Sequence, residues 1–143
     1  VDFSENYVPP ADSAYVGLTA DADVKTGVVS AQVGTIQAGY VAESGATLLE
    51  FPTPDETVAA VRNGEAVAVF ADKDFLAPYV AESNGELSFV GPDIPLGGGV
   101  GLAFRESDDE LREKFNAAIK AMKAEGVLNP LIEKHFGAAA KKF

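Results

Sequence analysis

The sequence has 143 residues, of which 47% are hydrophobic and 23% are charged, a balance that fits one compact domain or two small lobes and argues against disorder. The formal net charge is −11, so nucleic acids and anionic membrane surfaces are poor partners. The absence of cysteine excludes disulfides and thiol catalysis, and a single histidine excludes a metal site built from several histidines of one chain.

The N-terminal stretch "VDFSENYVPP" lacks the basic and apolar segments of a signal peptide. No apolar run approaches the roughly 20 residues that a membrane span requires. We therefore expect a soluble chain given without its signal peptide. Because the chain starts at Val1 and not at a methionine, we also expect that an upstream segment has been removed.

Residues 27–91 alternate between strand patterns and helix patterns. This alternation predicts an α/β fold with an open, doubly wound sheet and right-handed crossovers, in which ligands bind at the carboxyl ends of the strands. The predicted elements, in chain order, are the strand "GVVSAQV", the helix "TIQAGYVAES", the strand "ATLLEF", the helix "TPDETVAAVRNG", the strand "EAVAVFA", the helix "DKDFLAPYVAESNG" and the strand "ELSFVG".

The helix in "TPDETVAAVRNG" has the clearest boundaries. Thr53 and Glu56 have the spacing of a capping box, Pro54 occupies the first helical position, and Gly64 ends the pattern. We expect the helix to begin directly after Thr53.

The two ends of the chain lie outside this alternating pattern. "SAYVGLTA" and "PLGGGVGLAF" read as extended connectors, because their glycines weaken them as ordinary strand interiors. Ser107 and Glu110 predict a capped helix that runs to Gly126, and Asn129 and Pro130 predict the start of a last short helix. We expect the tail "AAAKKF" to be frayed.

The Gly34-Thr35 turn ends a run of β-branched residues and starts a helix. Such a turn leaves unpaired backbone N–H groups at the positive end of the helix dipole, which attracts anions. The alternative is that Thr35 only caps its own helix, which its hydroxyl does well. Asp72, at the end of "AVAVFA", has the same two interpretations: a carboxylate placed to bind a cation, or a helix cap.

The stretches "VDFSENYVPP", "QVGTIQAGY", "FPTPDETVAAVRNGEAVAVFADKDFL" and "GGGVGLAFRESDDELREKFNAAIKAMKAEGVLNPLIEKHFG" resemble the extracellular solute-binding proteins of family 3, the periplasmic amino-acid receptors of ABC importers. The resemblance implies a periplasmic-binding-protein type II fold. It covers only the later part of a usual family member, so most of the first lobe is missing, including the arginine that clamps the ligand carboxylate. On this basis residues 1–17 end lobe 1 and form the first hinge strand, 18–96 form the α/β lobe 2, and 97–143 form the return hinge strand and C-terminal helices.

The resemblance also implies a ligand-binding set of Gly34, Thr35, Ile36, Gln37 and Asp72. In the family the Gly-Thr turn contacts the ligand carboxylate through backbone N–H groups and hydroxyls, and the aspartate accepts the ligand's α-ammonium group. Ile36 departs from this pattern, because it replaces a second hydroxyl and offers only its backbone N–H. The loss of one neutral hydrogen bond, around 1 kcal/mol, weakens such a clamp without abolishing it.

The resemblance therefore implies a periplasmic amino-acid-binding component of an ABC importer, with a membrane permease as partner and no catalytic residue, metal or cofactor. One alternative on the same fold is an enzyme similar to cyclohexadienyl or arogenate dehydratases. A receiver-like phosphoacceptor role for Asp72 is disfavoured, because "QVGT" and "SFVGP" supply neither the acidic pair nor the lysine that it needs.

The missing lobe has its own consequence. A C-terminal helix with an apolar stripe would need another cover, which a homodimer, an element-swapped dimer or a separately supplied N-terminal fragment would provide. We expect one chain alone to bind free amino acids weakly or not at all.

Overall fold

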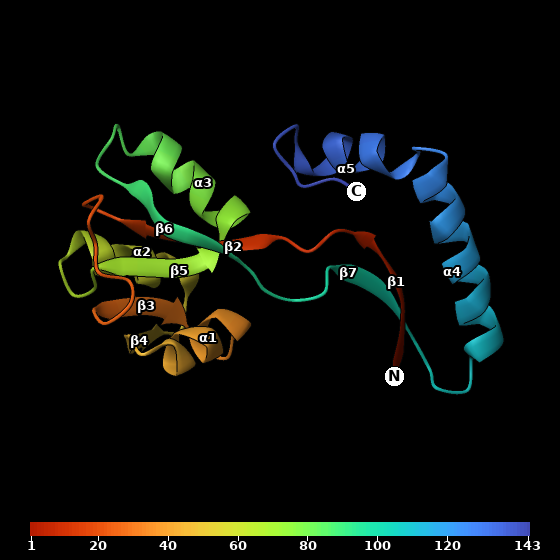
Figure 1. Cartoon of the computed structure of the whole chain (residues 1–143), viewed down its shortest axis with the longest axis horizontal. Coiled ribbons are helices and arrows are strands. Elements are labelled where there is room, and N and C mark those ends of the chain that lie inside the picture. Colours follow the sequence, from red (N-terminus) through yellow and green to blue (C-terminus); the bar gives the residue numbers. More distant parts are fainter. The chain divides into compact units, whose positions relative to one another are not determined.

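The computed structural model describes all residues, 1–143, and the chain divides into two compact units. One unit consists of residues 11–96, and the other combines residues 1–10 with residues 97–143. Figure 1 labels the elements of both units. None of the helices is both long enough and apolar enough to cross a membrane.

The unit of residues 11–96 is an α/β fold built on a five-stranded sheet, as the alternating pattern predicts. The strand order is β4-β3-β5-β2-β6. Its strands are β2 (Asp12–Gly17), β3 (Val28–Gln32), β4 (Thr47–Phe51), β5 (Ala68–Asp72) and β6 (Ser88–Pro95), and its helices are α1 (Ile36–Ser44), α2 (Pro54–Arg62) and α3 (Lys73–Glu82).

The sheet is mixed, because β2 runs against its neighbours. β3 pairs in parallel with β4 and β5, whereas β2 pairs antiparallel with both β5 and β6. The expectation that "SAYVGLTA" is a connector outside the sheet was therefore wrong. Gly17 ends this strand where a Cβ would lie 2.8 Å from the carbonyl oxygen of Val67, so the glycine permits close backbone approach instead of marking a break.

Helices cover both faces of this sheet, and each face has its own hydrophobic cluster. Val41 of α1 packs with Phe70 of β5 on one face, while Val58 of α2 and Leu76 of α3 pack with Val69 on the other. Phe70 and Val69 face opposite ways because successive side chains alternate along a strand. Because of the same alternation, Asp72 shares the face of Phe70, which α1 covers.

Local sequence signals set the ends of α1 and α2. Thr35 caps α1, and Gly45 ends it in the left-handed region with φ +96°. The predicted capping box of Thr53 and Glu56, with Pro54 at the start of α2, is present. Each helix thus begins within a few residues of the end of the preceding strand.

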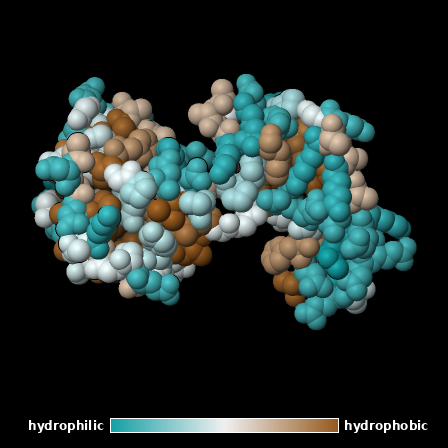
Figure 2. All heavy atoms as spheres, viewed as in Figure 1, coloured by the Kyte–Doolittle hydropathy of each residue, from teal (hydrophilic) through white to brown (hydrophobic).

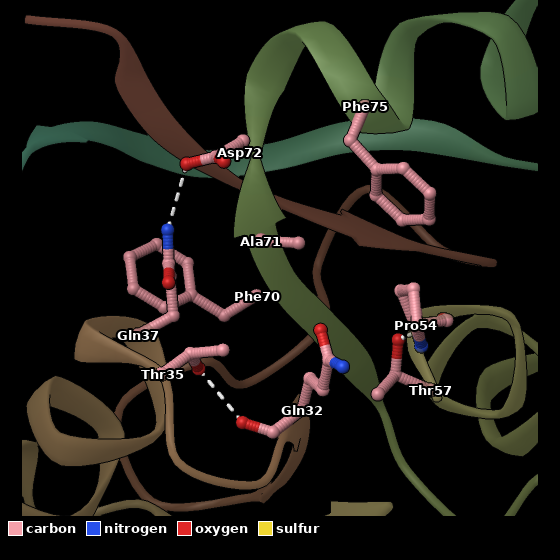
Figure 3. Close-up of a pocket in the computed structure, with 9 residues that line it drawn as sticks. All are labelled: Gln32, Thr35, Gln37, Pro54, Thr57, Phe70, Ala71, Asp72 and Phe75. Carbon is pink, nitrogen blue, oxygen red and sulfur yellow. Dashed lines mark hydrogen bonds between the residues drawn. The ribbon is translucent and has the colours of Figure 1, made fainter. Parts of the chain in front are cut away.

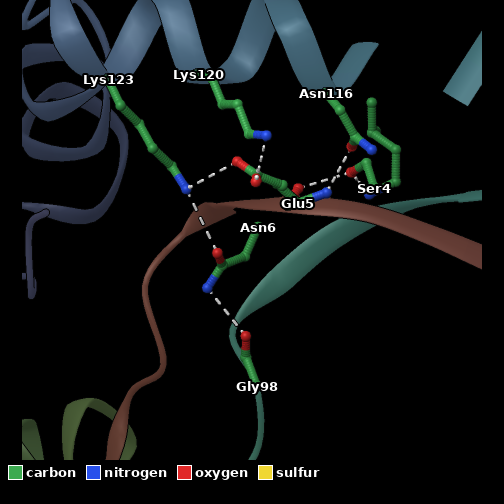
Figure 4. A network of polar contacts seen from close by, with 8 residues as sticks. Ser4, Glu5, Asn6, Gly98, Asn116, Lys120 and Lys123 are labelled. Atoms are coloured by element: carbon green, nitrogen blue, oxygen red, sulfur yellow. Dashed lines mark hydrogen bonds and ion pairs between the residues drawn. The ribbon is translucent and has the colours of Figure 1, made fainter. Parts of the chain in front are cut away.

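The second unit consists of a two-stranded antiparallel sheet and two helices: β1 (Asp2–Val8), β7 (Val100–Phe104), α4 (Asp109–Ala124) and α5 (Leu128–Phe136). Polar groups join β1 to α4 (Figure 4). The N–H of Glu5 donates to Oδ1 of Asn116 at 2.7 Å, and the Glu5 carboxylate lies 3.4 Å from Lys120 Nζ and 3.9 Å from Lys123 Nζ. Asn6 also donates through Nδ2 to the carbonyl oxygen of Gly98 at 2.9 Å.

The predicted starts of both C-terminal helices were wrong. α4 begins at Asp109, and the residue at its cap position, Asp108, makes no side-chain cap bond, so the capping box expected at Ser107 does not form. α5 begins at Leu128, before the predicted cap residue Asn129.

The C-terminal tail is held against α5, contrary to the expectation of fraying. The side chain of Asn129 donates to the carbonyl oxygen of Phe143 at 3.1 Å and accepts from its N–H at 3.0 Å. Lys142 Nζ lies 2.9 Å from the Glu133 carboxylate. Asn129 therefore uses the polar groups expected for a helix cap to hold the last residue.

Candidate functional site

A pocket of about 220 Å³ opens in the unit of residues 11–96, where strands β3 and β5 end and helices α1, α2 and α3 begin (Figure 3). Carboxyl ends of parallel strands are the usual position of ligand sites in α/β sheets. The residues that line the pocket are Gln32, Thr35, Gln37, Pro54, Thr57, Phe70, Ala71, Asp72 and Phe75.

Thr35 is held by its own helix. Its Oγ1 accepts a hydrogen bond from the N–H of Ala38 at 3.2 Å and donates to the carbonyl oxygen of Gln32 at 2.7 Å. A hydroxyl has one proton, so that of Thr35 is already committed. The capping interpretation of the hydroxyl is therefore right. Attraction for an anion at this turn depends on the backbone N–H groups of the first helical turn, which lack intrahelical acceptors.

Asp72 ends β5 and occupies the cap position of α3, but its side chain makes no cap hydrogen bond. Its Oδ1 instead accepts a hydrogen bond from Nε2 of Gln37 at 2.7 Å (Figure 3). The helix-cap alternative for this carboxylate is thus wrong. The side chain remains exposed at the pocket, where its charge is available to a bound cation.

Gln37 points inward. Only 7% of the residue is exposed, and its Nε2 donates to Oγ of Ser13 at 3.1 Å as well as to Asp72. Ser13 belongs to β2 and is 1% exposed. Three elements, α1, β2 and β5, therefore meet at this amide group.

Gly34 and Ile36 do not line the pocket, unlike Thr35, Gln37 and Asp72. Gly34 adopts φ +74° in the turn, which explains the need for glycine there, and the Ile36 residue is 58% exposed. Neither residue carries a polar side-chain atom, so a hydrogen bond from either can come only from its backbone.

Several residues of the pocket lay outside the sequence prediction. Gln32 at the end of β3, together with Pro54 and Thr57 at the start of α2, could have been found from the rule that ligands bind at strand ends. Ser13, which supports the pocket through Gln37 without lining it, had no such signal, because its segment was interpreted as a connector. Phe70, Ala71 and Phe75 read only as apolar packing residues.

The pocket combines one charged group with apolar walls. Asp72 is the only ionisable residue among those that line it, and Phe70, Phe75 and Pro54 supply apolar surface. Behind it, Tyr15 stacks on Phe70 with ring centroids 4.3 Å apart. Burial raises the pKa of Tyr15, and the neighbouring Tyr40 raises it further, so this phenol stays neutral at physiological pH.

This architecture is that of a known class of binding protein. The model of the bacterial extracellular solute-binding proteins, family 3, matches residues 1–138. The chain therefore belongs to this family, and the resemblance inferred from the sequence is confirmed.

Relatives with known structures support this assignment. A periplasmic His/Glu/Gln/Arg/opine family-binding protein from Silicibacter pomeroyi, solved in complex with lysine, is 63% identical with a TM-score of 0.81, over 99% of this chain and 65% of that one. An ancestral arginine-binding protein bound to arginine is 29% identical with a TM-score of 0.71, over 96% of this chain and 65% of that one. The fold thus matches part of periplasmic-binding-protein type II structures.

A relative of known function is also similar in sequence. The arginine-binding periplasmic protein of Mannheimia haemolytica is 28% identical over 141 residues, which cover 94% of this chain and 59% of the relative. The chain therefore spans roughly three fifths of this relative's length. These relatives are solute-binding proteins and not enzymes.

Proposed function

We propose that this chain contributes the second lobe, the hinge strands and the C-terminal helices of a periplasmic amino-acid receptor for an ABC importer. The observation that carries the proposal is the pocket that brings the N-terminus of α1 and the carboxylate of Asp72 together. Family membership supports it.

The ligand's two charged groups would bind at different sides of this pocket. Its α-ammonium group would bind Asp72 through a charge-assisted hydrogen bond. Its carboxylate would bind the turn at Gly34, Thr35 and Ile36, where backbone N–H groups and the helix dipole favour negative charge. Ile36 offers no hydroxyl, and that of Thr35 already donates to Gln32, so the backbone supplies this half of the clamp.

We infer that the ligand is a basic amino acid. The Silicibacter pomeroyi relative was solved with lysine, and the Mannheimia haemolytica relative is named for arginine. The pocket is consistent with this class, because no basic residue lines it that would repel a cationic side chain. The aromatic ring of Phe75 offers a surface that the stem of a long side chain would contact.

The domain division predicted from the sequence completes the proposal. Residues 1–17 and 97–143 would supply the two hinge strands and the part of lobe 1 present here, and residues 18–96 would form lobe 2. The end of the first hinge segment, β2, also pairs into the lobe 2 sheet. Closure of the lobes around the amino acid would create the form that a membrane permease binds, since a ligand shifts a conformational equilibrium only through its higher affinity for one state.

The second unit carries an apolar surface that fits a partly built lobe. Hydrophobic residues reach the surface, as Figure 2 shows for one face of the molecule. In the helices they are Leu111, Phe115, Leu131 and Phe136. A first lobe, a second copy of the chain or an element exchanged between copies would cover them.

Calorimetry on two proteins tests this function. One is the 143-residue chain, and the other is a fusion in which the N-terminal third of the Silicibacter pomeroyi relative precedes it. Both are titrated with L-lysine, L-arginine, L-histidine, L-glutamine and L-glutamate. We expect the fusion to bind L-lysine or L-arginine, and the chain alone to bind weakly or not at all.

Two variants of the fusion locate the site. Asp72→Ala should abolish most of the binding, because it removes the partner of the ammonium group. Asp74→Ala is the matched control, since Asp74 is an exposed acidic residue two positions later that does not line the pocket. A folded fusion that binds none of the amino acids, or one that binds equally well with Asp72→Ala, would contradict the proposal.

A further inference from the structure

The buried amide of Gln37 suggests a role other than ligand contact. We propose that Gln37, supported by Ser13, is a positioning residue that holds the Asp72 carboxylate in the orientation in which it binds a ligand's ammonium group. This inference rests on the proposed function of Asp72, and it revises the assignment of Gln37 as a ligand-binding residue.

The hydrogen bonds of Gln37 leave its amide nitrogen no proton for a ligand. A primary amide has two N–H donors. In Gln37 they point to Oδ1 of Asp72 at 2.7 Å and to Oγ of Ser13 at 3.1 Å. Gln37 lines the pocket, but only 7% of the residue is exposed, so its side chain serves mainly as an internal support.

Strand register brings the three side chains together. Ser13 and Asp72 are partners in the antiparallel pairing of β2 with β5. Asp72 shares its face of β5 with Phe70, which packs on the side of the sheet covered by α1. Gln37 lies in the first turn of α1 and therefore reaches both residues, and Figure 3 shows its amide nitrogen directed at the Asp72 carboxylate.

The hydrogen bond from Gln37 has a direct consequence for binding. The Asp72 side chain makes no helix-cap bond that would otherwise hold it. An aspartate side chain has three staggered χ1 rotamers, so an unrestrained one would occupy the binding rotamer for only a fraction of the time. Because apparent affinity falls in proportion to that fraction, equal population of the three rotamers would weaken binding about threefold.

Nuclear magnetic resonance of the 143-residue chain tests the positioning role without any ligand. Three-bond couplings to the Asp72 carboxyl carbon report its χ1 distribution. We expect one dominant rotamer in the wild-type chain and averaging over several in Gln37→Met, which keeps a long unbranched side chain but has no donor. Ser13→Ala, a smaller change, should broaden the distribution in the same direction to a lesser extent.

Gln32→Met is the matched control for this measurement. Gln32 lines the same pocket, but its Nε2 donates to the carbonyl oxygen of Pro52 at 3.2 Å and not to Asp72. The same substitution at this position should leave the Asp72 rotamer unchanged. Backbone amide spectra of each variant establish that it is folded.

The L-lysine affinity of the fusion protein provides the second readout. Gln37→Met should weaken L-lysine binding about threefold, in line with the rotamer averaging. If Asp72 keeps one rotamer in both Gln37→Met and Ser13→Ala, or if the rotamers average while affinity stays the same, the positioning role is wrong. A wild-type fusion that fails to bind amino acids overturns the proposed function instead, and the rotamer comparison still shows whether Gln37 holds Asp72.

Discussion

Ser13 and Asp72 lie opposite each other in the pairing of β2 with β5, and the amide of Gln37 donates to both side chains. This relationship places a residue from the start of the chain behind the candidate ligand site. The site is therefore supported by β2 as well as by α1 and β5.

The glycines that precede β7 differ in how much space they have, which predicts different costs of substitution. A Cβ at Gly99 would lie 2.4 Å from Nδ2 of Asn6 and 2.5 Å from the carbonyl oxygen of Val8, and Gly99 has φ +86°. We expect Gly99→Ala to lower the free energy of unfolding by about 1–3 kcal/mol, the usual cost of a strained backbone position. Urea denaturation measures this change.

Gly98→Ala is the control for that variant. A Cβ at Gly98 meets nothing within 4 Å, and its φ is not in the left-handed region. It should change the free energy of unfolding much less than Gly99→Ala. Equal losses in the two variants would contradict the steric explanation.

Ser30 should stabilise the core of the α/β unit through one buried hydrogen bond. Its Oγ donates to the carbonyl oxygen of Thr57 at 2.8 Å, and the serine is fully buried. Ser30→Ala would remove this hydrogen bond, at a cost of about 0.5–1.5 kcal/mol in thermal or urea unfolding. Ser88→Ala, on the exposed surface of β6, should stay within about 0.5 kcal/mol of wild type. A comparable loss at both serines would argue against the buried bond as the cause.

The contribution of the capping box at the start of α2 to the free energy of unfolding should be measurable by itself. Thr53 Oγ1 accepts from the N–H of Glu56, and the Glu56 carboxylate accepts from the N–H of Thr53 at 3.1 Å. Thr53→Ala removes the first of these bonds and should cost about 1 kcal/mol of stability. Thr53→Ser keeps the hydroxyl, so its stability should remain close to wild type. A serine variant as unstable as the alanine variant would show that the methyl group, and not the cap, matters.

The hydrogen bonds around the Asp23 carboxylate predict a specific pH dependence of stability. The hydroxyl of Thr26 and the N–H groups of Thr26 and Lys25 hydrogen-bond its carboxylate and lower its pKa. A lowered pKa means that the stabilisation is complete above the unfolded value, about 3.9, and is lost as the pH falls through the folded value. We expect the stability advantage of wild type over Asp23→Asn to be constant at neutral pH and to shrink below about pH 4.

Urea denaturation from pH 2 to pH 7 checks this expectation. Thr26→Val removes the hydroxyl that contributes most to the lowered pKa, so it should reduce the pH-dependent part of the stability. An advantage over Asp23→Asn that does not change with pH would rule out the carboxylate as its source.

Errors in the predicted fold arose where distant contacts overrode local signals. Asn129 carries a side chain suited to a helix cap, yet its amide holds Phe143 at the C-terminus. The segment containing Ser13 was interpreted as a connector because its glycine weakens it as a strand interior, but pairing with β5 and β6 on both sides places it inside the sheet. In both cases a polar group could bond either a nearby group in the sequence or a distant one. Tertiary structure decides between them, because it determines which partner lies within hydrogen-bond distance.

The sequence by itself determined the features that depend on a few consecutive residues: the cap at Thr35, the capping box at Thr53 and the left-handed glycine at Gly45. These follow from the geometry of a single turn. Only the tertiary structure decided that Gln37 meets Asp72, 35 positions away, and Ser13, 24 positions away, because those hydrogen bonds depend on strand register and on which face of the sheet α1 covers.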